Sequence, residues 1–112
     1  MAQFVKVAKE SELPDTEGTL EEVQGMGTLV EVEGNRLALF NMEGEVFAID
    51  DACPHDGGPL SEGPVQGDQV VCPWCGSRFS FMSGQAGGLP AIENVTSYKV
   101  RVTDEDDVEV EV

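Results

Sequence analysis

The sequence predicts an all-β protein, and three observations lead to that class. Apolar and polar residues alternate with a period of two wherever a pattern is clear, and no segment keeps a helical period for ten residues or more. Thirteen Gly and six Pro interrupt the chain at short spacing, as turns between short strands require. With 40% apolar residues the chain can build one modest core, so we expect a single domain over residues 1–112, folded as an antiparallel β-sandwich or small barrel.

Short apolar runs bounded by turn residues predict the strands of the N-terminal half. A single helical turn is expected at residues 11–13, because Pro14 cannot continue a helix. Turn residues at 33–35 and 41–44 connect the last three of these strands into a meander. The expected strands cover residues 4–7, 19–23, 28–32, 36–40 and 45–50.

A β-hairpin is predicted at the C-terminal end. Residues 98–102 alternate as Tyr-Lys-Val-Arg-Val, residues 108–112 alternate as Val-Glu-Val-Glu-Val, and the Asp-rich segment between them supplies the turn. Upstream of this hairpin, residues 51–90 hold most of the Gly and Pro, all three Cys and the one His. We interpret this stretch as a loop-rich subdomain that carries the functional site on a scaffold of strands.

The charge of the chain excludes two classes of partner. Its 22 acidic and 6 basic residues give a formal charge of −16, which repels nucleic-acid phosphates and anionic membrane surfaces. The same charge favours docking onto a basic patch of another protein, with an association that weakens as salt is added. No apolar run is long enough for a signal peptide or a membrane helix, so we expect a soluble cytoplasmic protein.

Cys72-Pro-Trp-Cys75 is a CxxC pair, a spacing shared by thiol redox couples, zinc sites and cluster sites. A thioredoxin-like couple needs a helix N-terminus to lower the pKa of its first thiol, but residues 76–81 alternate like a strand. A redox couple would also leave the segment Cys53-Pro-His55 without a role. The odd number of cysteines argues against a secreted disulfide framework, so metal binding is the favoured use of these residues.

Two short motifs together supply four candidate ligands, Cys53, His55, Cys72 and Cys75. Four is the number needed by a tetrahedral zinc ion or by a [2Fe–2S] cluster. Ligands that are only one residue apart, as Cys53 and His55 are, point away from each other on an extended turn and suit two metal ions better than one. A binuclear centre is therefore favoured, and a zinc-binding module with three Cys and one His remains the alternative.

These motifs resemble those of Rieske-type [2Fe–2S] ferredoxins. The family pattern is CxH followed after a short segment by CxxH, and this chain matches it at Cys53, His55 and Cys72, with Cys75 in the last place. The flanking segments CPHDGGPLSEG, GSRFS and SGQAGGLPA are similar as well. The resemblance implies a Rieske-like β-sandwich that holds one [2Fe–2S] cluster at the tips of two loops. One iron would be bound by Cys53 and Cys72, and the other by His55 and Cys75.

A Cys at position 75 affects the expected reduction potential. Imidazole binds iron as a neutral ligand and Cys binds it as a thiolate, so the cluster gains one negative charge and accepts an electron less readily. High-potential members of the family have two hydroxyl donors near the cluster and a disulfide between the loops. Ser77 matches the first hydroxyl, Phe79 lacks the second, and Gly58 with Trp74 cannot form the disulfide. The chain is thus similar to the low-potential soluble ferredoxins.

Glycine and proline within the two motifs are expected to shape the cluster cradle. Gly57, Gly58 and Gly76 can adopt backbone conformations closed to other residues, which would turn N–H groups toward a negative cluster. Pro54 and Pro73 are expected to stiffen the two loops.

The resemblance implies an electron carrier that passes single electrons from a reductase to an acceptor such as an oxygenase. A chain with one His cannot build the two-His, one-carboxylate iron site of an oxygenase, so we expect no catalytic residues in it. The second interpretation is a Rieske-like small subunit of an assimilatory reductase, in which the domain serves as an interaction module.

Overall fold

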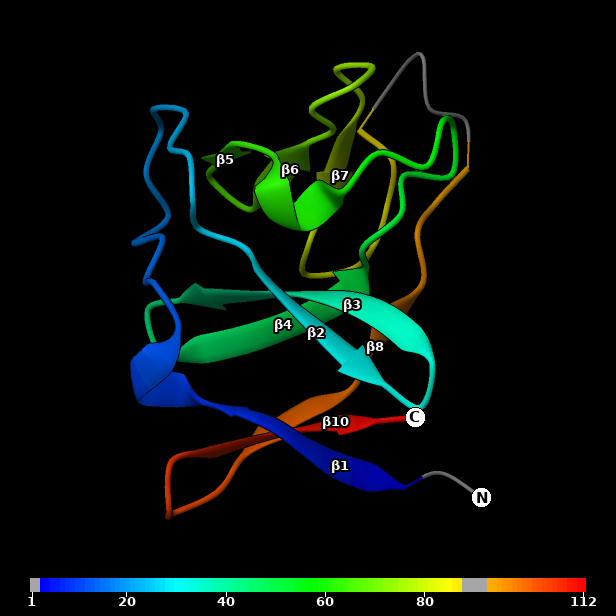
Figure 1. Ribbon diagram of the computed structural model, residues 1–112. Helices are drawn as coiled ribbons and strands as arrows, with labels where there is room; N and C mark the ends of the chain where they lie inside the picture. The colour runs from blue at the N-terminus through cyan, green and yellow to red at the C-terminus, as the bar shows by residue number, and fades with distance from the viewer. Residues whose placement is uncertain (1–2, 88–92) are drawn as a thin grey trace.

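The structure, a computed structural model, describes residues 3–87 and 93–112 and contains three antiparallel β-sheets (Figure 1). In this part of the chain there are two single-turn 3₁₀ helices, η1 (Glu10–Glu12) and η2 (Leu60–Glu62), and no α-helix. No helix within these residues is long and apolar enough to cross a membrane. The predicted all-β class is confirmed.

The central sheet has the strand order β2-β3-β4-β8 and contains the predicted meander. Glu33-Gly34 and Glu43-Gly44 connect its first three strands as two-residue turns, with positive φ at both positions of each turn. Such turns match the twist of the strands that they join. The strands are β2 (Thr28–Val32), β3 (Asn35–Met42), β4 (Glu45–Asp50) and β8 (Ser97–Tyr98).

Strand β3 is buried on both faces. Ala38 and Phe40 point into one apolar cluster, which we call the upper core, and Leu37 and Leu39 point into a second, the lower core. All four side chains are fully buried. Alternate residues of a strand face opposite sides of its sheet, so an unbroken apolar run at this position serves two cores at once.

A second sheet covers the lower core, with the strand order β1-β10-β9 (Figure 1). Val108 and Val110 of β10 are fully buried against the central sheet, while Glu109 between them is only partly covered. The predicted C-terminal hairpin is confirmed by the pairing of β9 with β10. The strands are β1 (Phe4–Lys9), β9 (Val100–Val102) and β10 (Asp107–Glu111).

Two strand predictions are wrong. Residues 98–102 do not form one strand: Tyr98 pairs with β4 of the central sheet, whereas β9 pairs with β10 after a break at Lys99. Residues 19–23 do not form a strand either, because only Val23 makes a β-bridge and Leu20 is 84% exposed. A period of two shows which residues share a face, but a strand also needs a neighbour to pair with. The helical turn predicted at 11–13 is present one residue earlier, as η1.

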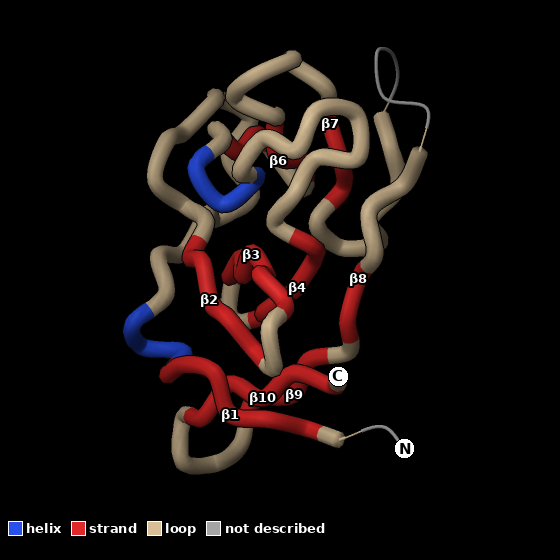
Figure 2. Tube along the Cα trace, turned by 45° about the vertical axis from the view of Figure 1, so that its right-hand side comes forward, coloured by secondary structure: helices blue, strands red, loops and turns tan. Residues whose placement is uncertain are grey.

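A third, smaller sheet covers the upper core, with the strand order β5-β6-β7. Figure 2 shows this sheet and the β1-β10-β9 sheet on opposite sides of the central sheet. The small sheet belongs to the loop-rich subdomain predicted at 51–90, whose residues 88–90 lie outside the described residues, as does part of the SGQAGGLPA segment. Its strands are β5 (Val65–Gln66), β6 (Gln69–Val71) and β7 (Arg78–Ser80).

Stacked aromatic rings join the small sheet to the central sheet in the upper core. Phe81, which follows β7, stacks on Phe40 of β3 with 4.8 Å between ring centroids and 15° between ring planes. Phe47 of β4 lies against the same Phe81 ring at 5.8 Å. Cys53 and Cys72 are buried members of this core, so the loops that begin at these two residues are anchored in it.

We expect Phe81→Ala to lower the free energy of unfolding by about 3–5 kcal/mol, because it removes a buried ring and the stacking contact with Phe40. Chemical denaturation followed by circular dichroism measures this change. Met82→Ala is the matched control, since Met82 is the next residue and is exposed, and its effect should stay within about 0.5 kcal/mol. Equal effects of the two substitutions would contradict the role assigned to the stack.

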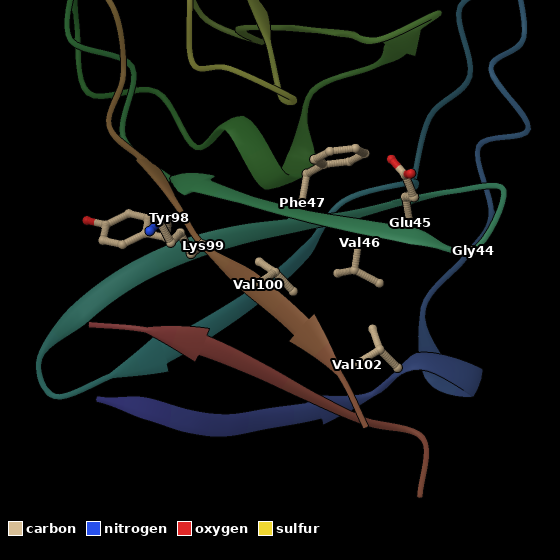
Figure 3. A pocket seen from close by; sticks show the side chains of 8 residues that line it. All are labelled: Gly44, Glu45, Val46, Phe47, Tyr98, Lys99, Val100 and Val102. Atoms are coloured by element: carbon tan, nitrogen blue, oxygen red, sulfur yellow. The ribbon is translucent and has the colours of Figure 1, made fainter. Parts of the chain in front are cut away.

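A surface hollow of about 470 Å³ opens where the chain passes from β8 of the central sheet to β9 of the β1-β10-β9 sheet. Its walls include Val46, Phe47, Val100 and Val102 (Figure 3). The hollow exists because β8 pairs with β4 at only two positions before the chain crosses to the other sheet. It contains no Cys, His or Asp and is therefore not the site that the sequence predicts.

Candidate metal centre

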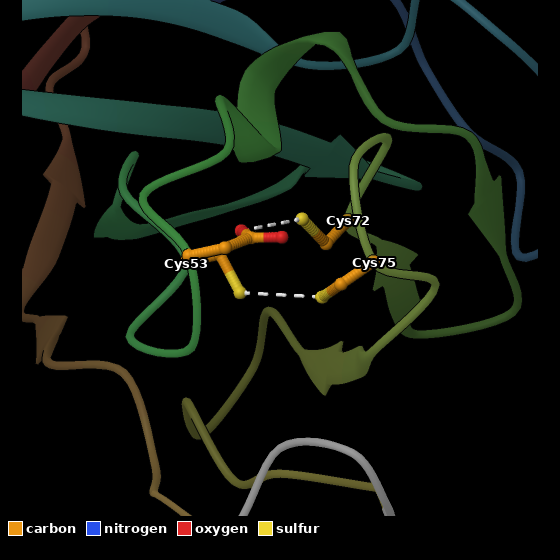
Figure 4. A group of neighbouring side chains, drawn as sticks. Cys53, Cys72 and Cys75 are labelled. Atoms are coloured by element: carbon orange, nitrogen blue, oxygen red, sulfur yellow. Dashed lines mark hydrogen bonds between the residues drawn. The ribbon is translucent and has the colours of Figure 1, made fainter.

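Two loops beside the small sheet carry all four predicted ligands. The first loop, residues 51–59, connects β4 to η2, and the second loop, residues 72–77, connects β6 to β7. Cys53 near the start of the first loop and Cys72 at the start of the second are both buried (Figure 4). The remaining two, His55 and Cys75, lie farther along the loops and are less buried.

The first loop is closed by backbone hydrogen bonds at Cys53. Its N–H donates to the carbonyl of Gly58 at 2.9 Å, and its carbonyl accepts from the N–H of Gly57 at 2.7 Å. The buried carboxylate of Asp51 accepts a hydrogen bond from the N–H of Ser61 at 2.7 Å and so fixes the base of the loop. The position of the Cys53 side chain is therefore set by the loop before any metal binds.

The second loop is closed by backbone hydrogen bonds at Cys72, in the same way as the first loop is closed at Cys53. The N–H of Cys72 donates to the carbonyl of Ser77 at 2.8 Å, and the carbonyl of Cys72 accepts from the N–H of Gly76 at 3.0 Å. Gly57 and Gly76 occupy the same place in their loops, with φ of 79° and 77°. The expectation that these two glycines adopt conformations unfavourable for other residues is confirmed.

Gly58 is needed for a different reason from the one predicted, because its φ is not positive. A Cβ atom at this position would lie 2.6 Å from the Sγ atom of Cys72 and 3.2 Å from Cγ of Trp74. The two loops approach each other at this point so closely that no side chain fits between them. The absence of a side chain at Gly58 thus lets the sulfur of Cys72 face the first loop.

Three sulfur atoms converge between the loops. The Sγ atoms of Cys53 and Cys75 are 3.8 Å apart (Figure 4), and all three cysteines are free thiols. Together with a carboxylate oxygen of Asp56, the three Sγ atoms lie within 4.8 Å of one another. A donor set rich in thiolate suits iron–sulfur clusters and zinc, so the residues present fit a soft metal centre.

Asp56 was not among the predicted site residues. Its Oδ1 atom accepts the N–H of Gly58 at 3.0 Å and lies 3.5 Å from the Sγ atom of Cys72. These bonds hold the pKa of Asp56 below its usual value, the hydrogen bond from Gly58 being the main cause. The signal in the sequence is the spacing: Asp56 follows Cys53 by the same interval that separates Cys75 from Cys72.

Burial and hydrogen bonding divide the thiols into two kinds. Burial raises the pKa of Cys72 to about 12, and it also raises the pKa of Cys53. Burial opposes ionisation of Cys75 too, but the hydroxyl of Ser77 at 3.0 Å, the backbone N–H of Ser77 and the side chain of His55 lower its pKa to about 7. The buried pair needs the positive charge of a metal to ionise, whereas Cys75 becomes a thiolate readily.

Comparison with known proteins relates this site to one family. The chain matches the Rieske [2Fe-2S] domain over residues 3–99. It is 37% identical over 73 residues to the ferredoxin component of the naphthalene 1,2-dioxygenase system of Pseudomonas putida, an alignment that covers 65% of this chain and 70% of that protein.

Solved structures agree with this match. The ferredoxin of carbazole 1,9a-dioxygenase from Nocardioides aromaticivorans IC177 has a TM-score of 0.83 at 24% identity, covering 96% of both chains, and so shares the fold. A chain from the complex of reduced oxygenase and oxidized ferredoxin in carbazole 1,9a-dioxygenase has a TM-score of 0.76 at 27% identity, covering 95% of this chain and 99% of that one.

The all-β scaffold, the three converging sulfurs and the family match together define the class of the protein, a small iron–sulfur electron carrier. The chain belongs to the Rieske [2Fe–2S] family, and its cofactor is one [2Fe–2S] cluster. When bound, that cluster takes up and releases a single electron. The family, the electron-carrier class and the cofactor predicted from the sequence are confirmed.

Proposed function

We propose that this chain is the ferredoxin component of a multicomponent oxygenase system, which receives single electrons from a reductase and passes them to the oxygenase. The observation that carries the proposal is the convergence of three cysteine sulfurs between two loops. The relative from Pseudomonas putida supports it, since that protein is the ferredoxin component of a dioxygenase system. The structure of a carbazole dioxygenase oxygenase–ferredoxin complex supports the oxygenase as the acceptor.

The proposed ligands are Cys53 and Cys72 for one iron, and His55 and Cys75 for the other. The first two are buried in the upper core, and the second two lie on the outer side of the loops. This division into a buried pair and a less buried pair supports assigning one pair to each iron. Cys75 thus stands in place of a second imidazole, which gives a cluster of low potential whose exposed side is at His55.

Metal analysis together with an EPR spectrum tests this assignment. Two irons and two inorganic sulfides per chain are expected, and dithionite reduction should give a signal distinct from that of clusters with two His ligands. Zinc without sulfide that persists after anaerobic reconstitution with iron and sulfide would overturn the proposal in favour of a zinc module. A colourless chain that contains no iron would instead favour the interaction module of an assimilatory reductase.

The proposed docking surface is acidic and surrounds the loops. Part of the support is the placement of three cations far from them, on the β1-β10-β9 sheet. Lys6 and Lys9 both lie against Asp107, at 3.3 Å and 2.9 Å, and Arg101 forms an ion pair with Glu109.

Two further cations lie nearer the loops, and each is next to a carboxylate. Arg36 is 4.0 Å from the buried Asp51, and Arg78 is 3.5 Å from Glu22. Residues 51–77, which include both loops, contain four carboxylates and no Lys or Arg, so this segment is negatively charged. Such a surface attracts a basic patch on a partner protein.

We expect added salt to slow electron transfer from the reduced protein to cytochrome c, a basic acceptor, on the order of tenfold between low and physiological ionic strength. Ferricyanide, an anionic acceptor, should show the opposite trend, because salt then screens a repulsion. Stopped-flow absorbance measures both rates. Rates that do not depend on salt for either acceptor would contradict the acidic docking surface.

We also propose that residues 1–112 form one domain that works in the cytoplasm. The central sheet is covered on its two faces by the other two sheets, and β3 contributes to both cores, which supports a single folding unit. Three free thiols fit a reducing compartment.

A further inference from the structure

The two loops of the site have equivalent residues at the third position after the first cysteine. The Rieske ligand pattern uses only one of these two residues. In each loop the residue that directly precedes the positive-φ glycine is the third after the first cysteine. This residue is Asp56 in the first loop and Cys75 in the second. The loops therefore present the pairs Cys53-x-x-Asp56 and Cys72-x-x-Cys75, which is the ligand spacing of single-ion sites.

Asp56 is held with its side chain directed at the sulfurs. Its Oδ1 atom is fixed by the N–H of Gly58 at 3.0 Å and lies 3.5 Å from the Sγ atom of Cys72. Asp56 belongs with Cys53, Cys72 and Cys75 to a group of four ligand atoms within 4.8 Å of one another, and His55 is not part of that group. A carboxylate oxygen therefore lies close enough to the three sulfur atoms to bind the same metal ion as they do.

The spacing of the sulfurs suits a single ion. Zinc binds thiolate sulfur at about 2.3 Å, and a tetrahedron of that size has edges of about 3.8 Å. The Sγ atoms of Cys53 and Cys75 are 3.8 Å apart.

We propose that the chain without its cluster binds one divalent ion of the zinc class through Cys53, Asp56, Cys72 and Cys75. His55 stays outside this coordination, and the thiols release their protons as the ion binds. The ion and the cluster then exclude each other, because they share three cysteines and differ only in the fourth ligand. The proposal is separate from the electron-transfer function, which uses His55.

The test begins with the full-length chain freed of its cluster under anaerobic, reducing conditions. Zn²⁺ affinity is measured by competition with a chromophoric chelator, and Co²⁺ replaces Zn²⁺ to report tetrahedral thiolate coordination in the visible spectrum. We expect Asp56→Ala to weaken Zn²⁺ binding by about 10- to 100-fold or more. Loss of a residue that only hydrogen-bonds to a metal ligand already has an effect of this size, and loss of a ligand should have at least the same effect. His55→Ala should leave the affinity unchanged.

The same variants are then reconstituted with iron and sulfide. Asp56→Ala should hold two irons and two sulfides per chain, whereas His55→Ala should lose the cluster. Asp68→Ala is the matched control, since Asp68 is an exposed carboxylate at the β5–β6 turn and should change neither result. Circular dichroism confirms that each variant is folded.

The outcomes separate the two proposals. Unchanged Zn²⁺ affinity in Asp56→Ala, a loss of affinity in His55→Ala, or failure of the unaltered chain to bind Zn²⁺ would each overturn the single-ion site. Loss of the cluster from Asp56→Ala would contradict the statement that the two occupants differ in their fourth ligand, because Asp56 would then be needed by both. A complete cluster in His55→Ala would instead contradict the ligand set proposed for electron transfer and leave the ion site standing.

Discussion

Replacing Cys75 by His is expected to raise the midpoint potential of the cluster by roughly 125 mV. Exchanging two Cys for two His lifts a [2Fe–2S] centre from about −400 mV to about −150 mV or higher, so one exchange should give about half of that change. The physical cause is the loss of one negative charge, because a neutral imidazole then replaces the Cys75 thiolate. Potentiometric titration followed by visible absorption measures the midpoint.

Trp74→His is the matched control for this exchange. It places an imidazole on the same loop, one residue earlier, at a side chain that is 66% exposed and is not a proposed ligand. The control should keep the original midpoint to within a small fraction of the shift expected for Cys75→His. An equal midpoint in Cys75→His and in the unaltered protein would show that residue 75 does not bind the cluster.

Gly58→Ala is expected to abolish most cluster binding while leaving the strand scaffold folded. The added Cβ would lie 2.6 Å from the Sγ atom of Cys72, closer than nonbonded atoms approach. Cys72 is buried in the upper core and cannot retreat, so the added methyl group must push the two loops apart. Iron content per chain and the visible spectrum measure the loss, and circular dichroism follows the scaffold.

The control for this substitution is Gly67→Ala. Gly67 has a φ of +61°, and a Cβ there would meet no atom within 4 Å, so the added methyl group costs only about 1 kcal/mol of backbone strain. The cluster should be retained in full. Full iron content in Gly58→Ala would contradict the close approach of the loops in the cluster-bound protein.

Local signals were enough to predict most of the fold. The turns at Glu33-Gly34 and Glu43-Gly44 and the alternation after Asp107 locate the meander and the final hairpin correctly, because tight turns and strand faces depend on neighbouring residues. The break at Lys99 depends instead on two sheets that compete for one stretch of chain. Leu20 lies in a segment with the pattern of a strand, but its side chain packs against no apolar surface of the described residues. Only the tertiary structure shows this.

For the site, the spacing of Cys53, His55, Cys72 and Cys75 predicted the two loops and the metal class. The structure brings the three cysteines together, but it adds Asp56, whose approach depends on how the two loops face each other. The need for Gly58 also arises from that contact between loops rather than from its own backbone conformation. Interactions between segments that are distant along the chain are what the local pattern lacks.

The uneven placement of the ion-paired lysines and arginines has a consequence for how the protein meets its partners. The three strands of the β1-β10-β9 sheet hold three cations and three carboxylates, whereas residues 51–77 hold four carboxylates and no Lys or Arg, so the uneven charge gives the molecule an electric dipole moment. The field of a partner with the proposed basic patch would exert a torque on that dipole during diffusion and turn the loops toward the partner before contact. More of the collisions then begin with the loops facing the partner, which shortens the distance for electron transfer. The rotational search that limits ordinary association becomes shorter.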